Sequence, residues 1–210
     1  KLINGLRTNT NYYYRVRTEN TSMTGAGAAG VTQEVRTLNL MAPPGNCLAL
    51  DGSSDYVSLP VSSGINNQFT NNRITVETWV FLKSHPTGSA APALITEGWD
   101  GNIKFSLHQY QGGIYAGFHY GSWTDAGFTD PLPLNRWVHI AATYDKANIN
   151  LNINGELVAT KATTLDLPAG NDEWRFGRRW DLNDCINGYM DEVKIYNEAL
   201  TQNQIILDMR

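Results

Sequence analysis

The 210-residue sequence has few cysteines, no long hydrophobic run and no excess of positive charge. Its two cysteines, Cys47 and Cys185, are far too few for a disulfide scaffold, and they could either pair or stay as two small thiols. No stretch approaches the roughly 18 successive apolar residues that a membrane span needs. The net charge of −4 leaves no basic patch for nucleic acid. We therefore expect neither membrane insertion nor nucleic-acid binding.

Short motifs of several enzyme classes are also missing. The sequence has no G-x-S-x-G nucleophile motif. It has no C-x-x-C and no H-E-x-x-H, so zinc chemistry has no support. With 41% hydrophobic and 17% charged residues the chain is expected to fold rather than to be disordered.

What the sequence does contain is a succession of short segments with the period of two that is typical of strands. Turn signals separate them, chiefly Gly112-Gly113 and Asn154-Gly155. We predict strands at 47–50, 55–60, 74–83, 93–98, 103–110, 114–121, 136–145, 149–154, 156–161, 174–177 and 189–196. About a dozen strands with almost no helical period predict an all-β sandwich or barrel. One short helix is expected at the end, where Thr201 and Gln204 form a capping box.

Residues 1–38 form a separate piece with two alternating segments, "YYYRVRTE" and "VTQEVRT". The stretch "LRTNTNYYYRVRTEN" resembles the C-terminal part of a fibronectin type III domain, with Leu6, Thr10 and Tyr12 at the spacing of the tyrosine corner. The first strands of such a domain are missing, so we expect a fragment of a longer modular protein. A hairpin alone buries too little, and self-association through it is one way to cover its apolar face. Residues 39–45 are predicted to be a linker.

Residues 46–210 resemble the laminin-G-like, concanavalin A-like jelly-roll domains. The motifs that carry the resemblance are "CLALDGSSDYVSLP", "ITVETWVFLK", "LPLNRWVHIAATYD", "INLNINGELVAT" and "FGRRWDLNDCINGYMDEVKIYNEAL". The resemblance implies a β-sandwich of two curved antiparallel sheets in which the first and last strands are neighbours.

That neighbourhood implies a site for a metal ion. Asp191 shares the alternation of Val193 and Ile195, which places it in line with predicted core positions. Asp51 would lie beside it, and two close carboxylates repel unless a cation such as calcium lies between them. Many members of the family have a structural calcium at such a place, so we predict calcium held by Asp51 and Asp191. The alternative is that Asp191 only accepts backbone hydrogen bonds.

Related jelly rolls include glycoside hydrolases, whose catalytic strand carries carboxylates spaced E-x-D-x-x-E. That string is absent here. Glu77 stands alone and would face His139 in a neighbouring strand, which we interpret as a structural pair rather than a catalytic one. We predict that this chain has no catalytic residues.

Aromatic residues give the remaining clue to a binding site. Trp79 and Trp137 lie within predicted strands and are expected in the core. Three other tryptophans lie in predicted loops with an aspartate close behind, a composition that suits sugar rings and their hydroxyl groups. The predicted ligand-binding residues are Trp99, Asp100, Tyr120, Trp123, Asp125, Arg178, Trp180 and Asp181. A face around Tyr110, Tyr115 and Tyr120 is the second choice, and loop-capping tryptophans are the structural alternative.

These observations predict a non-catalytic recognition module, for carbohydrate binding or adhesion, in a secreted or cell-surface multidomain protein. Its expected partner is a carbohydrate or a glycosylated surface. An accessory domain of a secreted glycoside hydrolase or protease is the alternative, and a structural spacer is the third.

Overall fold

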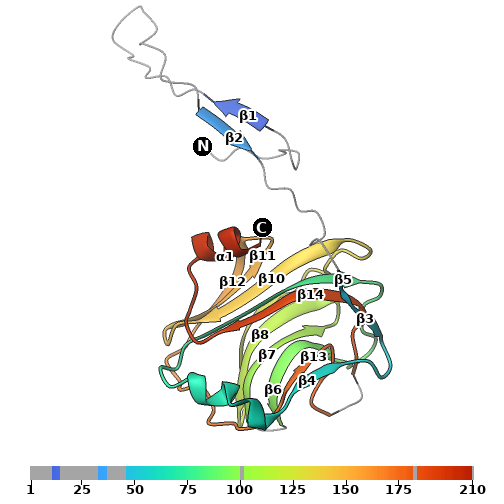
Figure 1. Ribbon diagram of the computed structural model, residues 1–210, viewed down its shortest axis with the longest axis vertical. Helices are drawn as coiled ribbons and strands as arrows, with labels where there is room; N and C mark the ends of the chain where they lie inside the picture. The colour runs from blue at the N-terminus through green and yellow to red at the C-terminus, as the bar shows by residue number, and fades with distance from the viewer. Residues whose placement is uncertain (1–10, 15–32, 37–45, 100–101, 182–183, 210) are drawn as a thin grey trace, which may run out of the picture. The chain divides into compact units, whose positions relative to one another are not determined.

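Figure 1 shows the computed structural model of the chain, which describes residues 11–14, 33–36, 46–99, 102–181 and 184–209. The chain divides into two units, Lys1–Met41 and Ala42–Arg210. In the first unit, β1 (Asn11–Tyr14) and β2 (Gln33–Arg36) pair antiparallel, which confirms the two predicted strands. Leu6, Thr10 and the side chain of Tyr12 lie outside this description, so the fibronectin type III interpretation stays a prediction.

The second unit is a sandwich of two six-stranded antiparallel sheets with one short C-terminal helix, as the sequence predicted. The first sheet has the order β12-β11-β10-β5-β14-β3, and the second has the order β4-β13-β6-β7-β8-β9. The strands of the first sheet are β3 (Leu48–Asp51), β5 (Ile74–Leu82), β10 (Trp137–Tyr144), β11 (Asn148–Ile153), β12 (Glu156–Ala162) and β14 (Asn187–Tyr196). Those of the second are β4 (Val57–Leu59), β6 (Ala93–Trp99), β7 (Asn102–Tyr110), β8 (Gly113–Tyr120), β9 (Trp123–Phe128) and β13 (Trp174–Phe176).

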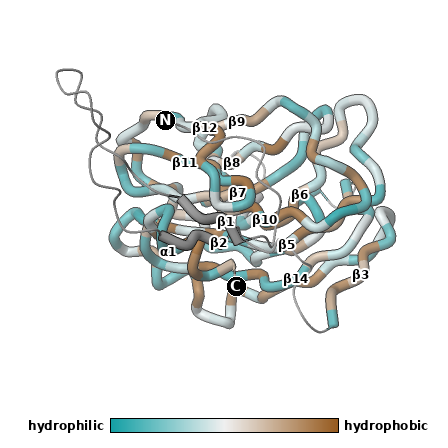
Figure 2. The backbone as a smooth tube through the Cα atoms, turned by 90° about the horizontal axis from the view of Figure 1, so that it is seen from above, coloured by the Kyte–Doolittle hydropathy of each residue, from teal (hydrophilic) through white to brown (hydrophobic). Residues whose placement is uncertain are grey.

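The core lies between the two sheets, because alternate residues of each strand point inward. In β10, Val138, Ile140, Ala142 and Tyr144 belong to the core. Figure 2 shows such hydrophobic stretches along β5, β7, β8 and β10. The tryptophan at the centre is Trp174, which is fully buried.

Trp174 was not among the predicted core residues. Its indole Nε1 donates to Asn66 Oδ1 at 2.7 Å, so its polar atom is satisfied inside the protein. Asn66 belongs to η2 (Ile65–Gln68), one of two short 3₁₀ helices that follow β4; the other is η1 (Val61–Ser63). The predicted core residue Trp79 is buried, but it packs beside His139 on the outer face of the first sheet. Trp137 is only partly buried and packs on Phe81, so its predicted core position is wrong.

The helix α1 (Gln202–Asp208) packs on the outer face of the first sheet (Figure 1). Thr201 caps it as predicted, with Gln204 reaching back to the Thr201 N–H. No helix in the described part of the chain is long and apolar enough to cross a membrane.

Two local predictions are wrong. Residues 123–128 were expected to be a loop but form β9, which pairs with β8 through the Gly121-Ser122 turn. The alternation at the start of β14 is broken by a bulge between Asp191 and Lys194, where Glu192 adopts a φ of 49°. Cys47 and Cys185 are both free thiols, so the disulfide alternative is not formed.

Candidate functional site

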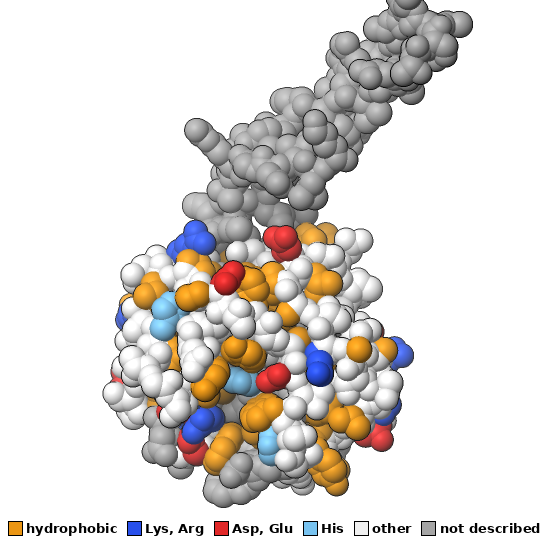
Figure 3. Space-filling view, turned by 180° about the vertical axis from the view of Figure 1, so that it is seen from behind, with side chains coloured by type: hydrophobic (Ala, Val, Ile, Leu, Met, Phe, Trp, Pro, Cys, Tyr) orange, Lys and Arg blue, Asp and Glu red, His pale blue; other side chains and the backbone are white. Residues whose placement is uncertain are grey.

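A pocket of about 450 Å³ lies on the outer face of the second sheet, over β7, β8 and β9. Its volume is within the range of small-molecule sites. Figure 3 shows a face of the molecule on which hydrophobic, histidine and acidic side chains lie next to one another. The lining residues used below are Ser106, His108, Tyr110, Tyr115, His119, Trp123, Asp125, Arg179 and Trp180.

The sequence builds this face by simple alternation. In β7, Phe105 and Leu107 point into the core, whereas Ser106, His108 and Tyr110 point outward into the pocket. In β8 the same period places Tyr115 and His119 on the outer face and leaves Ala116 and Phe118 inside. The pocket floor therefore consists of side chains that a sandwich does not need for its core.

Aromatic rings form a connected group across this floor. His108 stacks on Tyr115, with ring centroids 5.9 Å apart and an interplanar angle of 19°. Trp123 lies 5.0 Å from the His108 ring and 5.2 Å from the His119 ring. Its side chain is still 44% exposed. Trp123 is thus fixed by two histidines and keeps apolar ring surface available to a ligand.

His108 is a largely enclosed polar group of the pocket, at 9% exposure. Burial, with a smaller contribution from the charge of Arg179, lowers the pKa of His108 to about 4. The imidazole is therefore neutral at physiological pH. Its Nδ1 lies 3.2 Å from Ser106 Oγ, so one ring nitrogen is engaged within the sheet.

Two glycines allow close packing in the pocket floor. At Gly117 a side chain would collide with β9, because an added Cβ would lie 2.1 Å from Thr124 O. At Gly127 an added Cβ would lie 2.4 Å from Tyr115 Cε1, so the Tyr115 ring occupies the space above this glycine. The two glycines therefore allow β8, β9 and the Tyr115 ring to pack closely beneath the pocket.

One wall of the pocket comes from the loop between β13 and β14. Arg178 and Cys185 form a β-bridge, and the Arg179 N–H donates to Asp184 O, so the loop folds back on itself. The Arg179 guanidinium pairs with the carboxylates of Asp181 and Asp184, the latter at 3.1 Å. Asp184 Oδ2 also accepts from Ala91 N at 2.8 Å, which ties this wall to the loop between β5 and β6.

The predicted ligand-binding residues divide into three groups. Trp123, Asp125 and Trp180 line the pocket, together with Tyr110 and Tyr115 of the second-choice surface. The side chains of Trp99 and Asp100 lie outside the described part of the chain.

The third group lies away from the lining of the pocket. Tyr120 is 74% exposed and is not a lining residue. Arg178 packs over the Tyr56 ring. Asp181 acts through its ion pair with Arg179. Sequence reasoning missed Ser106, His108 and His119, although the alternation of polar and aromatic residues in the predicted strands 103–110 and 114–121 contained the signal.

The predicted pairing of Asp51 with Asp191 is wrong. The first and last strands are neighbours, but their register places Asp51 opposite Asn187, four residues and about 13 Å before Asp191. Asp191 lies opposite Trp79 on the outer face, because the bulge separates it from the register of Val193 and Ile195.

Each of the two carboxylates has its own backbone partners. Asp51 Oδ1 accepts from the backbone N–H groups of Ser53, Ser54 and Asp55, and these bonds, that of Ser54 first, lower its pKa to about 2. Asp191 Oδ1 accepts from Glu192 N. The two residues do not fit a shared calcium site. In the described residues no group of three His, Cys, Asp or Glu side chains is arranged to hold a metal ion. Calcium binding therefore stays a prediction.

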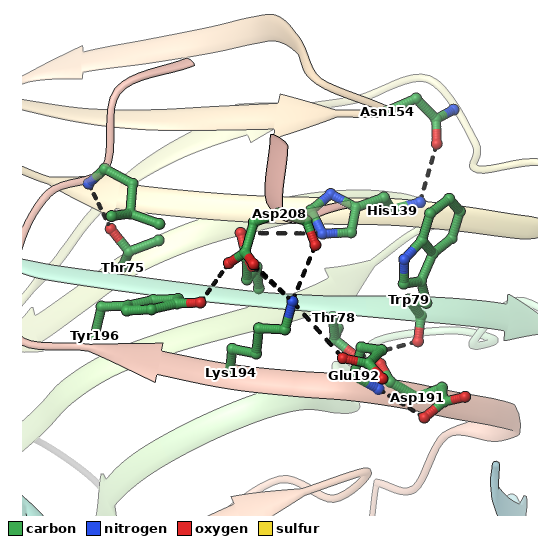
Figure 4. A network of polar contacts seen from close by, with 12 residues as sticks. Thr75, Thr78, Trp79, His139, Asn154, Asp191, Glu192, Lys194, Tyr196 and Asp208 are labelled. Carbon is green, nitrogen blue, oxygen red and sulfur yellow. Dashed lines mark hydrogen bonds and ion pairs between the residues drawn. The ribbon is translucent and has the colours of Figure 1, made fainter. Parts of the chain in front are cut away.

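A second polar cluster lies on the opposite side of the molecule, under α1 (Figure 4). Glu77 is fully buried and its carboxylate lies 4.0 Å from His139 Nε2 and 3.7 Å from Lys194 Nζ. The Glu77–His139 separation is too long for the hydrogen bond that the sequence suggested. Lys194 Nζ donates to the backbone carbonyl and to Oδ1 of Asp208, each at 3.0 Å. Glu77 and His139 are buried within this cluster, so a ligand cannot reach either side chain.

Comparisons with solved structures agree with the sandwich described above. Domain 4 of AbnA, an extracellular arabinanase from Geobacillus stearothermophilus in complex with arabinotriose, has a TM-score of 0.57 and 22% identity, covering 66% of this chain and 67% of that one. The binding domain of botulinum neurotoxin DC in complex with SialylT has a TM-score of 0.61 and 16% identity, covering 79% of this chain and 44% of that one. At these identities the likeness shows a shared fold.

Comparisons of sequence define the family. Mouse pappalysin-1 is 25% identical over 203 residues, which are 80% of this chain but 11% of that protein. The chain thus spans a small part of the curated relative that it matches. A family model described as the concanavalin A-like lectin/glucanases superfamily matches residues 51–206, which include all but the first strand residues of the sandwich and most of α1. With the two six-stranded sheets in place, this match shows that the chain belongs to the concanavalin A-like lectin/glucanases superfamily.

Proposed function

We propose that residues 46–210 form a non-catalytic carbohydrate-binding module that uses the pocket over β7, β8 and β9. The observation that carries the proposal is the environment of Trp123, whose partly exposed ring lies beside His108 and His119. The apolar C–H face of a sugar packs on such a ring, while its hydroxyl groups need donors and acceptors nearby. Asp125 and the neutral imidazole of His108 provide these.

The carboxylates of the pocket support a role without catalysis. Glycoside hydrolysis uses two carboxyl groups that flank one bond. Among the described residues that line the pocket, Asp125 is the one carboxylate. Asp181 and Asp184 are paired with Arg179, and Glu77 is enclosed under α1 on the other sheet.

Two structural neighbours support the sugar as ligand, because one is in complex with arabinotriose and the other with SialylT. The arabinanase domain also favours a second role, that of an accessory domain in a larger extracellular enzyme. We propose an extracellular location on the same ground. The two roles share the same binding surface and differ in what is attached to it.

A glycan array followed by calorimetry with the best ligand tests the proposal. Trp123→Ala should weaken binding at least fivefold while the variant stays folded, because a stacked aromatic ring carries much of the affinity in such a site. Trp137→Ala is the matched control, since it removes a partly buried indole from the first sheet. Equal loss in both variants, or an array without any bound glycan, would show that the pocket is not a sugar site.

A further inference from the structure

The charges around the pocket indicate which sugars it accepts. Arg179 is the one cationic side chain among the described residues that line the pocket. Its guanidinium is paired with Asp181 and with Asp184. An arginine that binds an acidic ligand needs its forked N–H groups for that ligand. Here two carboxylates of the same loop already compensate the positive charge.

Asp125 adds a further acidic group on the opposite side. It lies in β9 opposite Gly117, and a Cβ added at Gly117 would lie 2.7 Å from Asp125 Cβ, so β8 and β9 approach closely at this point. No other described residue forms a hydrogen bond with this carboxylate. Burial raises the pKa of Asp125, and the charge of Lys161 on β12 acts against that shift. Lys161 is exposed and does not line the pocket, so solvent screens most of its effect on a ligand.

We propose, resting on the proposed function, that this pocket selects uncharged sugars and excludes sugars that carry a carboxylate or a sulfate. Counting the Asp and Arg side chains alone, the lining residues together with Asp181 and Asp184 have more negative than positive charges, whether or not Asp125 is ionised. An anion that enters a partly enclosed site loses hydration, and it needs a cation to offset that loss.

A neutral sugar has no charged group whose hydration is lost when it enters the pocket. A hydroxyl group can donate to the Asp125 carboxylate, and the ring can pack on Trp123. The same carboxylate that accepts from a hydroxyl group repels an acidic substituent, so attraction to one class and rejection of the other come from one residue.

The test uses pairs of probes in which one member is neutral and the other carries one or more carboxylates. Lactose is compared with 3′-sialyllactose, and galactose-based trisaccharides are compared with trigalacturonic acid, in calorimetric titrations at pH 7 and low salt. We expect the neutral member of a pair to bind at least tenfold more tightly. Asp125→Asn should reduce that ratio, because it removes the repulsion but keeps the shape of the side chain. Raising the salt concentration to 1 M should reduce the ratio in the parent protein.

The outcomes separate the two proposals. If the acidic members bind as tightly as the neutral ones, or more tightly, the charge argument is wrong while the carbohydrate site stands. If neither class binds and an array of further glycans also shows no binding, the proposed function is wrong. The proposed selectivity is then wrong as well. A ratio that is unchanged in a folded Asp125→Asn protein would assign the exclusion to another feature and overturn the role given to this carboxylate.

Discussion

Gly127 and Tyr115 are opposed residues of β9 and β8, and the ring of Tyr115 lies directly over the bare backbone of Gly127. An alanine methyl group at position 127 would lie 2.4 Å from Cε1 and 2.5 Å from Cδ1 of that ring. Two atoms cannot approach so closely. The pair therefore determines how far the tyrosine ring stands out of the sheet and into the pocket.

Gly127→Ala should tilt the Tyr115 ring and weaken ligand binding about fivefold or more, with little change in stability, because a ring at the surface can move. Gly117→Ala should differ. Its methyl group would lie 2.1 Å from the backbone oxygen of Thr124, so β8 and β9 must separate. We expect the free energy of unfolding to fall by about 1–3 kcal/mol. Calorimetry measures the first effect and chemical denaturation measures the second.

The control for this comparison is the Tyr115→Leu background. If Gly127→Ala acts through the tyrosine ring, adding it to Tyr115→Leu should weaken binding no further. An additional loss of the full size in the double variant would mean that the alanine disturbs β9 itself.

Stability should fall as the pH rises from 6.5 toward 8. Burial, with Asp208 nearby, raises the pKa of Glu77 from 4.5 to about 8, so the folded state holds a proton that the unfolded state releases between these values. Stability from this group therefore falls as pH rises toward 8. Burial of Glu97 raises its pKa too and acts in the same direction. His108 and His139 have pKa values lowered to about 4, chiefly by burial, so their contribution falls as pH drops from 6.5 to 4.

Glu77→Gln should flatten the alkaline side of this profile. Between pH 6.5 and 8.5 the melting temperature of the parent should fall by at least about 3 °C, which corresponds to roughly 1 kcal/mol for a domain of this size. The melting temperature of Glu77→Gln should fall by less over the same pH range. Glu156→Gln, at an exposed position of β12, serves as the control and should follow the parent. A Glu77→Gln profile parallel to that of the parent would contradict the assignment.

Lys194 and Asp208 should hold α1 on the first sheet as a coupled pair. Asp208 receives two hydrogen bonds from Lys194 Nζ and one from the Tyr196 hydroxyl. Lys194→Met and Asp208→Asn should each lower the free energy of unfolding by about 1–2 kcal/mol. The double variant should lower it by less than the sum of the two single losses. If the losses of unfolding free energy in the two single variants add up to the loss in the double variant, the two residues act independently.

Hydrogen exchange should locate this effect. We expect faster exchange of the α1 amides in both single variants, with the amides of β7 and β8 unchanged. Ligand binding should also be unchanged, because α1 and the pocket lie on opposite outer faces. Lys161→Met, at an exposed position of β12, is the matched control for removing a lysine charge.

The sequence predicted the fold well because a period of two and Asn-Gly turns are local signals that tertiary structure rarely overrides. It missed β9, whose segment "WTDAGF" has a threonine and a small alanine at two of its three inward positions, although Gly121-Ser122 is a hairpin signal. It also placed Asp191 on the wrong face, because one bulge residue in αL conformation reverses every side chain before it.

The site was predicted in part for a related reason. Tryptophans and aspartates are visible as a composition, so Trp123, Asp125 and Trp180 could be named from the sequence. The role of His108 depends on which neighbours the sheet brings together, since Tyr115 and Trp123 pack on it from two other strands. The sequence of β7 alone therefore does not indicate the environment of His108.

The position of β14 has a consequence for how the domain is made. It is the last strand of the sandwich to be synthesised, yet it lies between β5 and β3 inside the first sheet. Until residues 187–196 leave the ribosome, these two earlier strands each expose an unpaired edge on which foreign strands can add. Folding from the N-terminus during translation cannot complete the sheet, so closure waits for a contact between distant parts of the chain. Nascent chains stalled before Asn187 should therefore be the species that chaperones bind and that aggregates recruit.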